Sequence, residues 1–522
     1  MSPHLLLTFA GTAKIALPKI DYSSILPELV MLGAAIISMI VSSLTPRRDL
    51  TWPYTAIGVV ASLVAGEWSL HLFEVVRSQG AKATIAGAIS SDGFSTFLMV
   101  VISVSVLLSL LIAQGVIFND AAKGPEYSAL ILLSASGAMF MAAANDLIVV
   151  FLGLEILSIS LYVLVGFRRS ASESQEAAMK YFVLGGFSSA IFLYGIALTY
   201  GATGTSNISK IAQYLANNTL TSNGVLLAGM VLILVGLGFK VAAVPFHFWT
   251  PDVYQGAPTS VTGFMAGVAK AGGFAALLRI FYVSFSTLSL DWKPLIITLA
   301  VLSTIVGAVL ALSQRDVKRM LAYSSINHAG FILIGLATAT AYGVSDSLYY
   351  LFAYSIMIVG TFGVISMVSA ARGNFEGPIL VSDLKGLAKQ NPALGLALAI
   401  FLVAQAGAPF TTGFLAKFSV ISAAVQSKEY LLAVAAMMTA VVAVYFYLRL
   451  AFAIYTDRED DEKLAVAASG GGVATEVETV KVTYRPPVVT LVGVGLAMAF
   501  TIVFGIYSSP LITFAHQAVL MH

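Results

Sequence analysis

The sequence contains no cysteine, few histidines and little charge, and each of these shortages excludes a class of protein. Without cysteine, its 522 residues form no disulfide, no c-type haem attachment and no thiolate-bound iron–sulfur cluster. Only two of the six histidines, His247 and His328, look embedded in the membrane, so pairs of haem ligands are not expected. No phosphate-binding glycine loop or HExxH zinc motif is present, and the net charge of +2 gives no sign of nucleic-acid binding. The chain itself is therefore expected to hold no metal and no cofactor.

Long apolar runs make up most of what remains. Hydrophobic residues are 58% of the chain, charged residues are 10%, and the mean hydropathy is +0.90, which is typical of a polytopic membrane protein. No cleavable signal peptide is expected, because Met1–Leu17 lacks a convincing positive region. Since about 20 apolar residues span a bilayer as a helix, we expect an all-α protein with about fourteen transmembrane helices, at 24–44, 53–75, 93–114, 126–143, 146–166, 176–200, 224–249, 259–283, 294–312, 319–340, 346–370, 393–424, 430–455 and 487–508.

Lysine and arginine are unevenly distributed between the two sets of connecting loops. With the N-terminus outside, 15 of them lie inside, 7 lie outside, and 6 fall within the segments. Because cytoplasmic loops carry the positive excess, we expect a bacterial plasma (inner) membrane protein with both termini on the periplasmic side. The inside set is Arg47, Arg48, Lys123, Arg168, Arg169, Arg315, Lys318, Arg319, Arg372, Lys385, Lys389, Arg458, Lys463, Lys481 and Arg485.

Two groups of five segments match in length and in the position of a proline. The seventh and twelfth segments are long and contain Pro245 and Pro409, and a proline inside a helix removes a backbone donor, so both are predicted to be discontinuous. Five is an odd number, so the second group enters the membrane from the opposite side. This predicts an inverted repeat, in which ion sites lie near mid-membrane at the broken helices.

The expected organisation has five parts. Residues 1–125 form an N-terminal three-helix segment, 126–283 the first repeat and 294–455 the second. Residues 456–486 are the one long polar loop, on the inside, and 487–522 hold the last helix and the tail. The loop is expected to be a flexible connector, with docking of a partner as the alternative.

Glu155 and Lys240 are ionisable residues at the middle depth of two predicted helices. Charged groups in a bilayer are costly and are, by default, candidates for an ion or proton pathway. Burial favours the neutral form of either group, whereas a nearby opposite charge favours the ionised form. A carboxylate near a buried lysine can therefore control whether the lysine holds its proton. We predict an ion relay for this pair, with a structural salt bridge as the alternative.

Three further ionisable residues are predicted to continue the relay. Lys270 lies among small residues that allow helices and water to approach, and Lys417 follows Pro409 by eight residues. His328 lies in Leu321-Ala-Tyr-Ser-Ser-Ile-Asn-His328, and histidine titrates near neutral pH. For Lys270 the alternative is snorkelling to an interface, and for His328 it is a hydrogen-bonded core histidine.

Two other residues have open roles. Lys180, near the inner end of its segment, is either a proton-uptake point or an interfacial anchor. His247 follows the helix-breaking Pro245 closely and either handles protons or satisfies a carbonyl freed by the break.

Four stretches together resemble a known family. They are Gly236-Leu-Gly-Phe-Lys240 through Pro258, Leu152-Gly-Leu-Glu155, Leu321 to His328, and Pro409 to Lys417. They are similar to the antiporter-like subunits of respiratory complex I, over essentially the whole chain. The run Val-Pro-Phe-His-Phe-Trp-Thr-Pro-Asp-Val-Tyr-Gln-Gly-Ala-Pro is most similar to the subunit N (chain 2) branch, since subunits L and M and the Mrp-type antiporters typically carry Trp-Leu-Pro-Asp-Ala there.

The resemblance implies a proton-translocating, non-redox subunit of NADH:quinone oxidoreductase. In the family pattern Glu155 and Lys240 match the pair of helices 5 and 7, Lys270 the central lysine and Lys417 the exit-side lysine, while the match at His328 is weaker. NAD, FMN, iron–sulfur clusters and quinone would belong to partner subunits. The implied partners are the antiporter-like subunits L and M, the small subunits K, J and A, and the lipid bilayer.

Two other functions remain open from the residues alone. A self-standing or Mrp-like sodium/proton antiporter would use the same buried charges, and sodium-dependent transport by the isolated chain would indicate it. A structural membrane anchor with unused charges would tolerate the loss of Lys240.

Overall fold

A computed structural model describes residues 20–44, 51–117, 124–218, 223–371, 378–456 and 486–520. Within these ranges, twelve helices are long and apolar enough to cross a membrane, which confirms the prediction of an all-α polytopic protein. The one exception is a short antiparallel hairpin of β1 (Lys82–Thr84) and β2 (Ile89–Ser91). The predicted loop at 456–486 lies outside the described residues except at its two ends, as do Met1–Leu17, Arg47, Arg48, Lys123, Arg372, Arg458, Lys463, Lys481 and Arg485.

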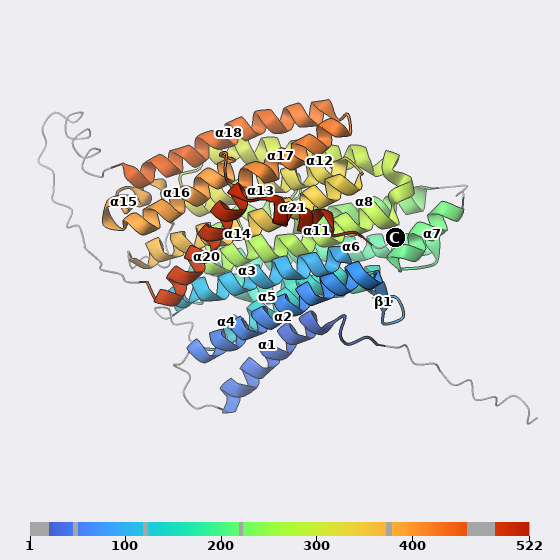
Figure 1. Cartoon of the computed structure of the whole chain (residues 1–522), viewed down its shortest axis with the longest axis horizontal. Helices are drawn as coiled ribbons and strands as arrows, with labels where there is room; N and C mark the ends of the chain where they lie inside the picture. The colour runs from blue at the N-terminus through green and yellow to red at the C-terminus, as the bar shows by residue number, and fades with distance from the viewer. Residues whose placement is uncertain are drawn as a thin grey trace, which may run out of the picture.

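The N-terminal segment contributes three helices at one edge of the molecule. They are α1 (Leu26–Leu44), α2 (Trp52–Gln79) and α3 (Gly93–Ile117). Figure 1 shows α1 and α2 along one edge, with α18 (Tyr430–Tyr455) along the opposite edge. The last long helix, α20 (Val488–Ile506), returns to pack on α3 and α14 (Ala341–Ala371) and is followed by the short α21 (Ser509–His516). Helix α3 therefore lies between α2, from the first part of the chain, and α20, from the last part.

The first five-segment unit begins with α4 (Glu126–Ala143), α5 (Leu147–Val165) and α6 (Ser172–Thr203). The short α7 (Ile208–Asn217) leads to α8 (Gly224–Lys240) and α9 (Trp249–Gly256). A continuous helical stretch then runs through α10 (Thr259–Phe264), η1 (Met265–Ala269), α11 (Lys270–Arg279) and η2 (Ile280–Ser284), in which η1 and η2 have π-helical geometry.

The second unit has the same order of elements. After the one-turn η3 (Ser286–Leu288) come α12 (Ser289–Leu312), α13 (Val317–Ala337) and α14. The turn η4 (Val381–Leu384) and the short α15 (Leu387–Gln390) lead to α16 (Pro392–Ala406), α17 (Thr412–Gln426) and α18.

Both long proline-containing segments are interrupted, at the places the sequence indicates. Helix α8 ends at Lys240 and α9 starts at Trp249, so the break begins before Pro245 and continues past it. Helix α16 ends at Ala406 and α17 starts at Thr412, with Pro409 between them. The predicted segment 393–424 is a pair of half-helices, α16 and α17, because proline cannot donate to the helical ladder. The predicted segment 224–249 ends too early, because its second half-helix, α9, only begins at Trp249 and runs to Gly256.

The first two helices of each unit approach closely through a glycine in the same relative position. A Cβ atom on Gly137 of α4 would lie 2.5 Å from the backbone nitrogen of Leu157 in α5. A Cβ atom on Gly307 of α12 would likewise lie 2.5 Å from the backbone nitrogen of Asn327 in α13. Small residues allow such close backbone contact between membrane helices. The two units therefore begin with the same kind of helix pair.

Contacts at the helix ends gather the loops into two sets. At one end of the bundle, Asn145 and Asn207 both donate to the Gly87 carbonyl beside the hairpin, at 3.0 and 2.8 Å. At the other end, Lys318 donates to the Ala257 carbonyl at 2.7 Å. Loops that alternate along the chain thus lie at opposite ends, as successive membrane crossings require.

Three helical stretches are the most deeply buried of the long ones within the described residues. The stretch Thr259–Ser284 and helix α14 are entirely buried in their apolar windows, and α13 is nearly so, whereas α1, α6 and α20 expose most of theirs. A helix covered by protein on all sides can hold ionisable groups away from lipid. The candidate site lies in this buried layer.

Candidate functional site

Lys240 is the last residue of α8 and is 6% exposed. Its ammonium donates to the Ser158 hydroxyl of α5 at 2.8 Å and lies 3.4 Å from the Tyr181 hydroxyl of α6. A cavity of about 10 Å³ beside it is lined by Ser158, Tyr162 and Ser188, among others. That volume is close to the smallest that holds a single water. Hydroxyls and water-sized space surround the charge, which suits proton exchange.

Glu155 lies one turn before Ser158 on α5 and is half-buried. One of its carboxylate oxygens is buried and has no hydrogen-bond partner among the described residues. Its charge acts on both Lys240 and Tyr162, so the structure brings the predicted pair into one site. Within the described part of the chain, however, Lys240 bonds to Ser158 and not to the carboxylate. A direct salt bridge is therefore not what holds the pair.

Lys270 opens α11, directly after the π-helical turn η1, and is 3% exposed. Its ammonium donates to Ser325 of α13 twice, to the carbonyl at 2.6 Å and to the hydroxyl at 2.5 Å. The Tyr254 hydroxyl of α9 lies 3.3 Å from the same Ser325 hydroxyl. Turns of π-helix occur most often at functional sites. Ser325 thus connects the central lysine to the second half of the first broken helix.

A line of aromatic rings runs from Tyr254 back to the Lys240 site. Trp249 stacks on Tyr181 with ring centres 4.7 Å apart and meets Tyr254 edge-on at 6.4 Å. Its indole N–H donates to the Phe239 carbonyl at 3.0 Å, at the end of α8. The break between α8 and α9 therefore places aromatic rings and hydroxyls between the two lysines.

His328 is held between two tyrosine hydroxyls. Its Nδ1 lies 2.7 Å from the Tyr350 hydroxyl of α14, and its Nε2 lies 2.8 Å from the Tyr447 hydroxyl of α18. The Tyr447 hydroxyl also bonds to Ser324, the neighbour of Ser325. Tyr354 lies with its ring centre 4.7 Å from that of His328, and the Lys270 ammonium is 5.5 Å from the same ring. Both ring nitrogens thus face hydroxyls, so the imidazole can accept a proton on one side and donate on the other.

Lys417 lies on α17 and is 5% exposed. Its ammonium donates to the Ala406 carbonyl, the last residue of α16, at 2.9 Å. It also lies 5.3 Å from the centre of the Phe331 ring, which stacks on Tyr350. Lys417 therefore sits across the second helix break and close to the His328 site.

Several buried polar atoms along this layer lack a hydrogen-bond partner within the described residues. Leaving such an atom unpaired is costly, and buried polar atoms usually satisfy each other or bond to ordered water. They are the Tyr349 and Tyr354 hydroxyls, the Asn327 and Gln405 amide oxygens, and the hydroxyls of Ser136 and Thr412.

Two predicted residues lie apart from this layer. Lys180 forms ion pairs with Glu176 at 2.8 Å and with Asp252 at 2.7 Å, and Asp252 also pairs with Arg319 at 2.6 Å. These groups tie the ends of α6, α9 and α13 together. His247 lies inside the break after α8, 7% exposed, with its ring on Phe248 and its Nδ1 buried and unpartnered among the described residues.

Sequence reasoning missed the partners of the charged groups and one buried ion pair. Ser158, Ser325 and Tyr447 are ordinary residues on apolar helices, and no local pattern marks them. Arg279 and Asp92 form a bidentate pair, at 2.7 and 2.9 Å, with exposures of 1% and 0%. The sequence does contain a sign of the Arg279–Asp92 pair, since both charges lie at ends of apolar segments.

The fold and the buried charges define a class, the antiporter-like membrane subunits. Residues 144–443 match the family described as "NADH:quinone oxidoreductase/Mrp antiporter, TM". A solved chain of the Mrp complex from Dietzia sp. has a TM-score of 0.82 over 95% of this chain and 96% of its own, at 20% identity, which shows a shared fold. A chain of respiratory complex I from Thermus thermophilus has a TM-score of 0.74 at 29% identity, covering 93% of this chain and 98% of its own.

Sequence identity then identifies the family within the antiporter-like subunits. It is 41% identical to NADH-quinone oxidoreductase subunit N of Trichlorobacter lovleyi over 447 residues, 85% of this chain and 89% of the relative. The chain belongs to the subunit N family of NADH-quinone oxidoreductase, as its Gly236–Pro258 run indicates.

Proposed function

We propose that this chain is a proton-translocating membrane subunit of NADH:quinone oxidoreductase and that its buried ionisable layer is the proton pathway. One observation carries the proposal: Lys240, Lys270, His328 and Lys417 are all at least nine-tenths buried and are joined by hydroxyls and aromatic rings across the molecule. Charges in such positions are costly, and where they occur they usually mark an ion or proton pathway.

The pathway runs between the two broken helices. Glu155 and Lys240 form its first site, where the carboxylate sets how firmly the ammonium holds its proton. Ser325 and Lys270 form the centre. His328, between Tyr350 and Tyr447, passes the proton toward Lys417 at the second break. Water fills the gaps between these groups, because side chains alone do not bridge the whole distance.

Two residues act at the margins of the pathway. Lys180, in its ion pairs with Glu176 and Asp252, anchors the inner end of α6 to α9 and lies near the point of proton uptake. His247, beside Pro245 in the first break, is the candidate for a second uptake group.

The topology of the proposal has fourteen crossings. Twelve are continuous helices, and the two broken ones are α8 with α9 and α16 with α17. Residues 126–283 and 294–455 are inverted repeats, which the matching helix pairs at Gly137 and Gly307 support. Both termini lie on the periplasmic side of a bacterial inner membrane, because the lysine- and arginine-rich loops then face inward.

Electron transfer belongs to partner subunits in this proposal. NAD, FMN, the iron–sulfur clusters and quinone are held there, and this chain carries protons only. Its partners are the antiporter-like subunits L and M and the small subunits K, J and A of complex I, all within the lipid bilayer.

The test measures proton uptake and NADH oxidation together. The intact complex, with Lys270→Met or with the exposed-lysine control Lys210→Met, is reconstituted in vesicles and supplied with NADH and quinone. We expect Lys270→Met to slow proton transfer through this chain by about 100-fold or more, the usual contribution of a positioned proton-transfer group. Lys210→Met should leave the ratio of protons to NADH unchanged.

Two outcomes would contradict the proposal. An unchanged proton ratio in a fully assembled Lys270→Met complex would make the chain a structural anchor. Transport by the isolated chain that requires sodium and continues without NADH would make it a sodium/proton antiporter.

A further inference from the structure

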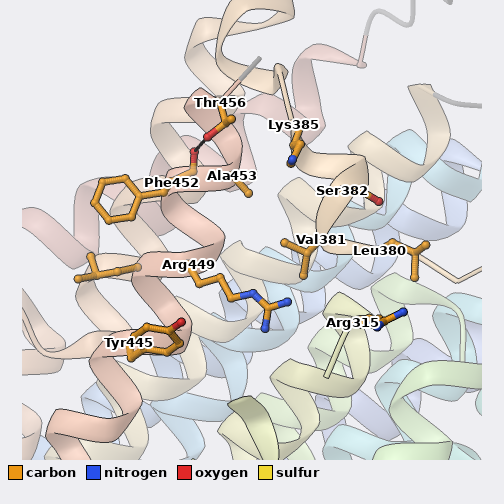
Figure 2. Close-up of a pocket in the computed structure, with 11 residues that line it drawn as sticks. Arg315, Leu380, Val381, Ser382, Lys385, Tyr445, Arg449, Phe452, Ala453 and Thr456 are labelled. Carbon is orange, nitrogen blue, oxygen red and sulfur yellow. Dashed lines mark hydrogen bonds between the residues drawn. The ribbon is translucent and has the colours of Figure 1, made fainter. Parts of the chain in front are cut away.

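A cavity of about 770 Å³ opens at the inner end of the second unit, apart from the proton pathway. Its walls come from three places: the turn between α12 and α13, the segment around η4, and the last three turns of α18. Figure 2 shows Arg449 reaching from α18 toward Val381, with Arg315 on the far side and Lys385 above. The lining residues are Arg315, Leu380, Val381, Ser382, Lys385, Tyr445, Leu448, Arg449, Phe452, Ala453 and Thr456.

The lining combines three cations with apolar walls. Arg315, Lys385 and Arg449 contribute positive charge, and no carboxylate is among the described residues that line the cavity. The nearest carboxylates in sequence are used by the backbone. Asp316 accepts from the Arg319 and Ile379 N–H groups, and Asp383 accepts from Leu380. Neither of these two carboxylates lines the cavity, whose described lining has three cations and no carboxylate.

The walls are fixed in place by hydrogen bonds. The Val381 N–H donates to the Arg315 carbonyl at 3.0 Å, and the Val317 N–H donates to the Ile379 carbonyl at 2.7 Å, so the segment at 379–381 is tied to the α12–α13 turn. The Arg449 guanidinium donates to the Leu312 carbonyl at 3.0 Å, which orients it while leaving other N–H groups for a ligand. The site is thus preorganised for an anion.

The cavity continues onto a strongly apolar surface. Val441, Tyr445 and Phe452 of α18 are 68, 65 and 68% exposed. These side chains follow one another along the helix from the cavity toward mid-membrane. A ligand that fits both parts has an anionic head for the three cations and a hydrocarbon chain for the helix face.

We propose that this cavity binds the phosphate headgroup of an anionic phospholipid from the inner leaflet, with the acyl chains along α18. Basic pockets between transmembrane helices on the cytoplasmic side bind such headgroups. Arginine forms paired hydrogen bonds to phosphate oxygens, whereas lysine adds a point charge. The proposal uses the orientation given above but is independent of proton translocation, since lipid binding is measured without turnover.

The experiment is photolabelling of the intact complex in lipid nanodiscs. A photoactivatable phosphatidylglycerol is incorporated, and labelled peptides are mapped by mass spectrometry. We expect labelling on Tyr430–Tyr455 and a loss of about five-fold for each of Arg315→Gln and Arg449→Gln, from the usual worth of one basic residue near an anionic membrane. Arg77→Gln, an exposed arginine at the opposite end, is the control and should change nothing.

Three control experiments distinguish an anionic phospholipid from other occupants of the cavity. A phosphatidylcholine probe should label the same peptide several-fold less, and equal labelling would overturn the proposal. Soluble inorganic phosphate at millimolar concentration should not compete, and displacement of the label by it would overturn the role of the acyl chains. Because the sequence continues from Thr456 into acidic residues, Asp460→Asn with Asp461→Asn should leave labelling unchanged. A strong rise in labelling would instead identify those carboxylates as the occupant.

Discussion

The Lys417 ammonium bonds to the carbonyl of Ala406, so a lysine after the second helix break caps the half-helix before it. The carbonyl end of a helix carries partial negative charge, and a cation there is stabilising. The same group thus holds α16 and α17 in register and stores a charge inside the membrane layer. Loss of its proton would weaken both effects at once, which couples the charge of this site to its geometry.

Removing the charge of Lys417 should disturb both the cap on α16 and proton transfer at this site. We expect Lys417→Met to stop proton transfer at the second break, while Lys417→Arg keeps the cap but holds its proton too firmly to release it. Proton uptake by vesicles containing the complex should fall about 100-fold through this chain in either variant. Thermal unfolding should separate them, since only Lys417→Met loses the hydrogen bond to Ala406. Equal pumping by Lys417→Arg and the unaltered complex would show that release from this lysine is not required.

Glu155 and Lys240 should behave as one unit. Glu155→Gln keeps the shape of the side chain but removes the charge that acts on Lys240. Glu155→Gln, Lys240→Met and the double variant should all lower proton transfer to a similar level, because groups that act together are non-additive. Strictly additive losses would mean that the two act independently. Glu173→Gln, an exposed carboxylate near the start of α6, serves as the control and should have no effect.

The hydroxyl of Tyr447 links Ser324 to His328, so its loss should interrupt the chain of donors. Tyr447→Phe keeps the ring and leaves a buried imidazole nitrogen unpaired, at a cost of about 1–3 kcal/mol. We expect the rate of proton transfer to fall about ten-fold or more. Tyr445→Phe, two residues earlier and 65% exposed, is the matched comparison. If both variants pump alike, the route does not pass through Tyr447.

The Asp92–Arg279 pair should contribute to stability rather than to transport. It joins the start of α3 to the end of α11, and Arg279 also donates to the Ala142 carbonyl of α4 at 3.0 Å. Breaking a fully buried pair by removing one partner costs about 3–5 kcal/mol, so Arg279→Ala should lower the unfolding temperature of the solubilised complex markedly. Lys293→Ala removes a pair with Glu429 that is a quarter exposed, and its cost should be about 1 kcal/mol or less. The prediction is wrong if the two variants unfold at the same temperature.

The sequence predicts the features of this structure that depend on residues close together in the chain. Helix positions and the interruptions near Pro245 and Pro409 are local, because hydrophobic length and a missing N–H act within a few residues. Lys240, Lys270 and Lys417 could be identified because a charge in an apolar run is conspicuous by itself. Their placement in the predicted relay is still a hypothesis, while their burial is a property of the fold.

The partners of these charges could not be read from the chain. Ser158 is 82 residues from Lys240, and Tyr447 is 119 residues from His328. Serines and tyrosines are common on membrane helices, so only the tertiary contacts that bring Ser158 to Lys240 and Tyr447 to His328 distinguish these residues from their neighbours. The pair of Glu155 and Lys240, for which a salt bridge is the alternative to a relay, shows the same limit. Equal depth in two helices predicts proximity, but the rotation of each helix decides which atoms touch.

The two broken helices have a consequence for the direction of transport. Lys240 is the last residue of α8 and the Lys417 ammonium bonds to the last residue of α16, so both lysines belong to the negative end of a half-helix. In the proposed inverted repeat these half-helices enter from opposite sides, and a proton moving between them would leave one electrostatic environment for another of the same kind. Because the two ends of such a path are electrostatically alike, the path itself favours neither direction of proton movement. The bias that makes it a pump must therefore be imposed from outside this chain, by whichever neighbour shifts the charge of Glu155 or Lys417 during turnover.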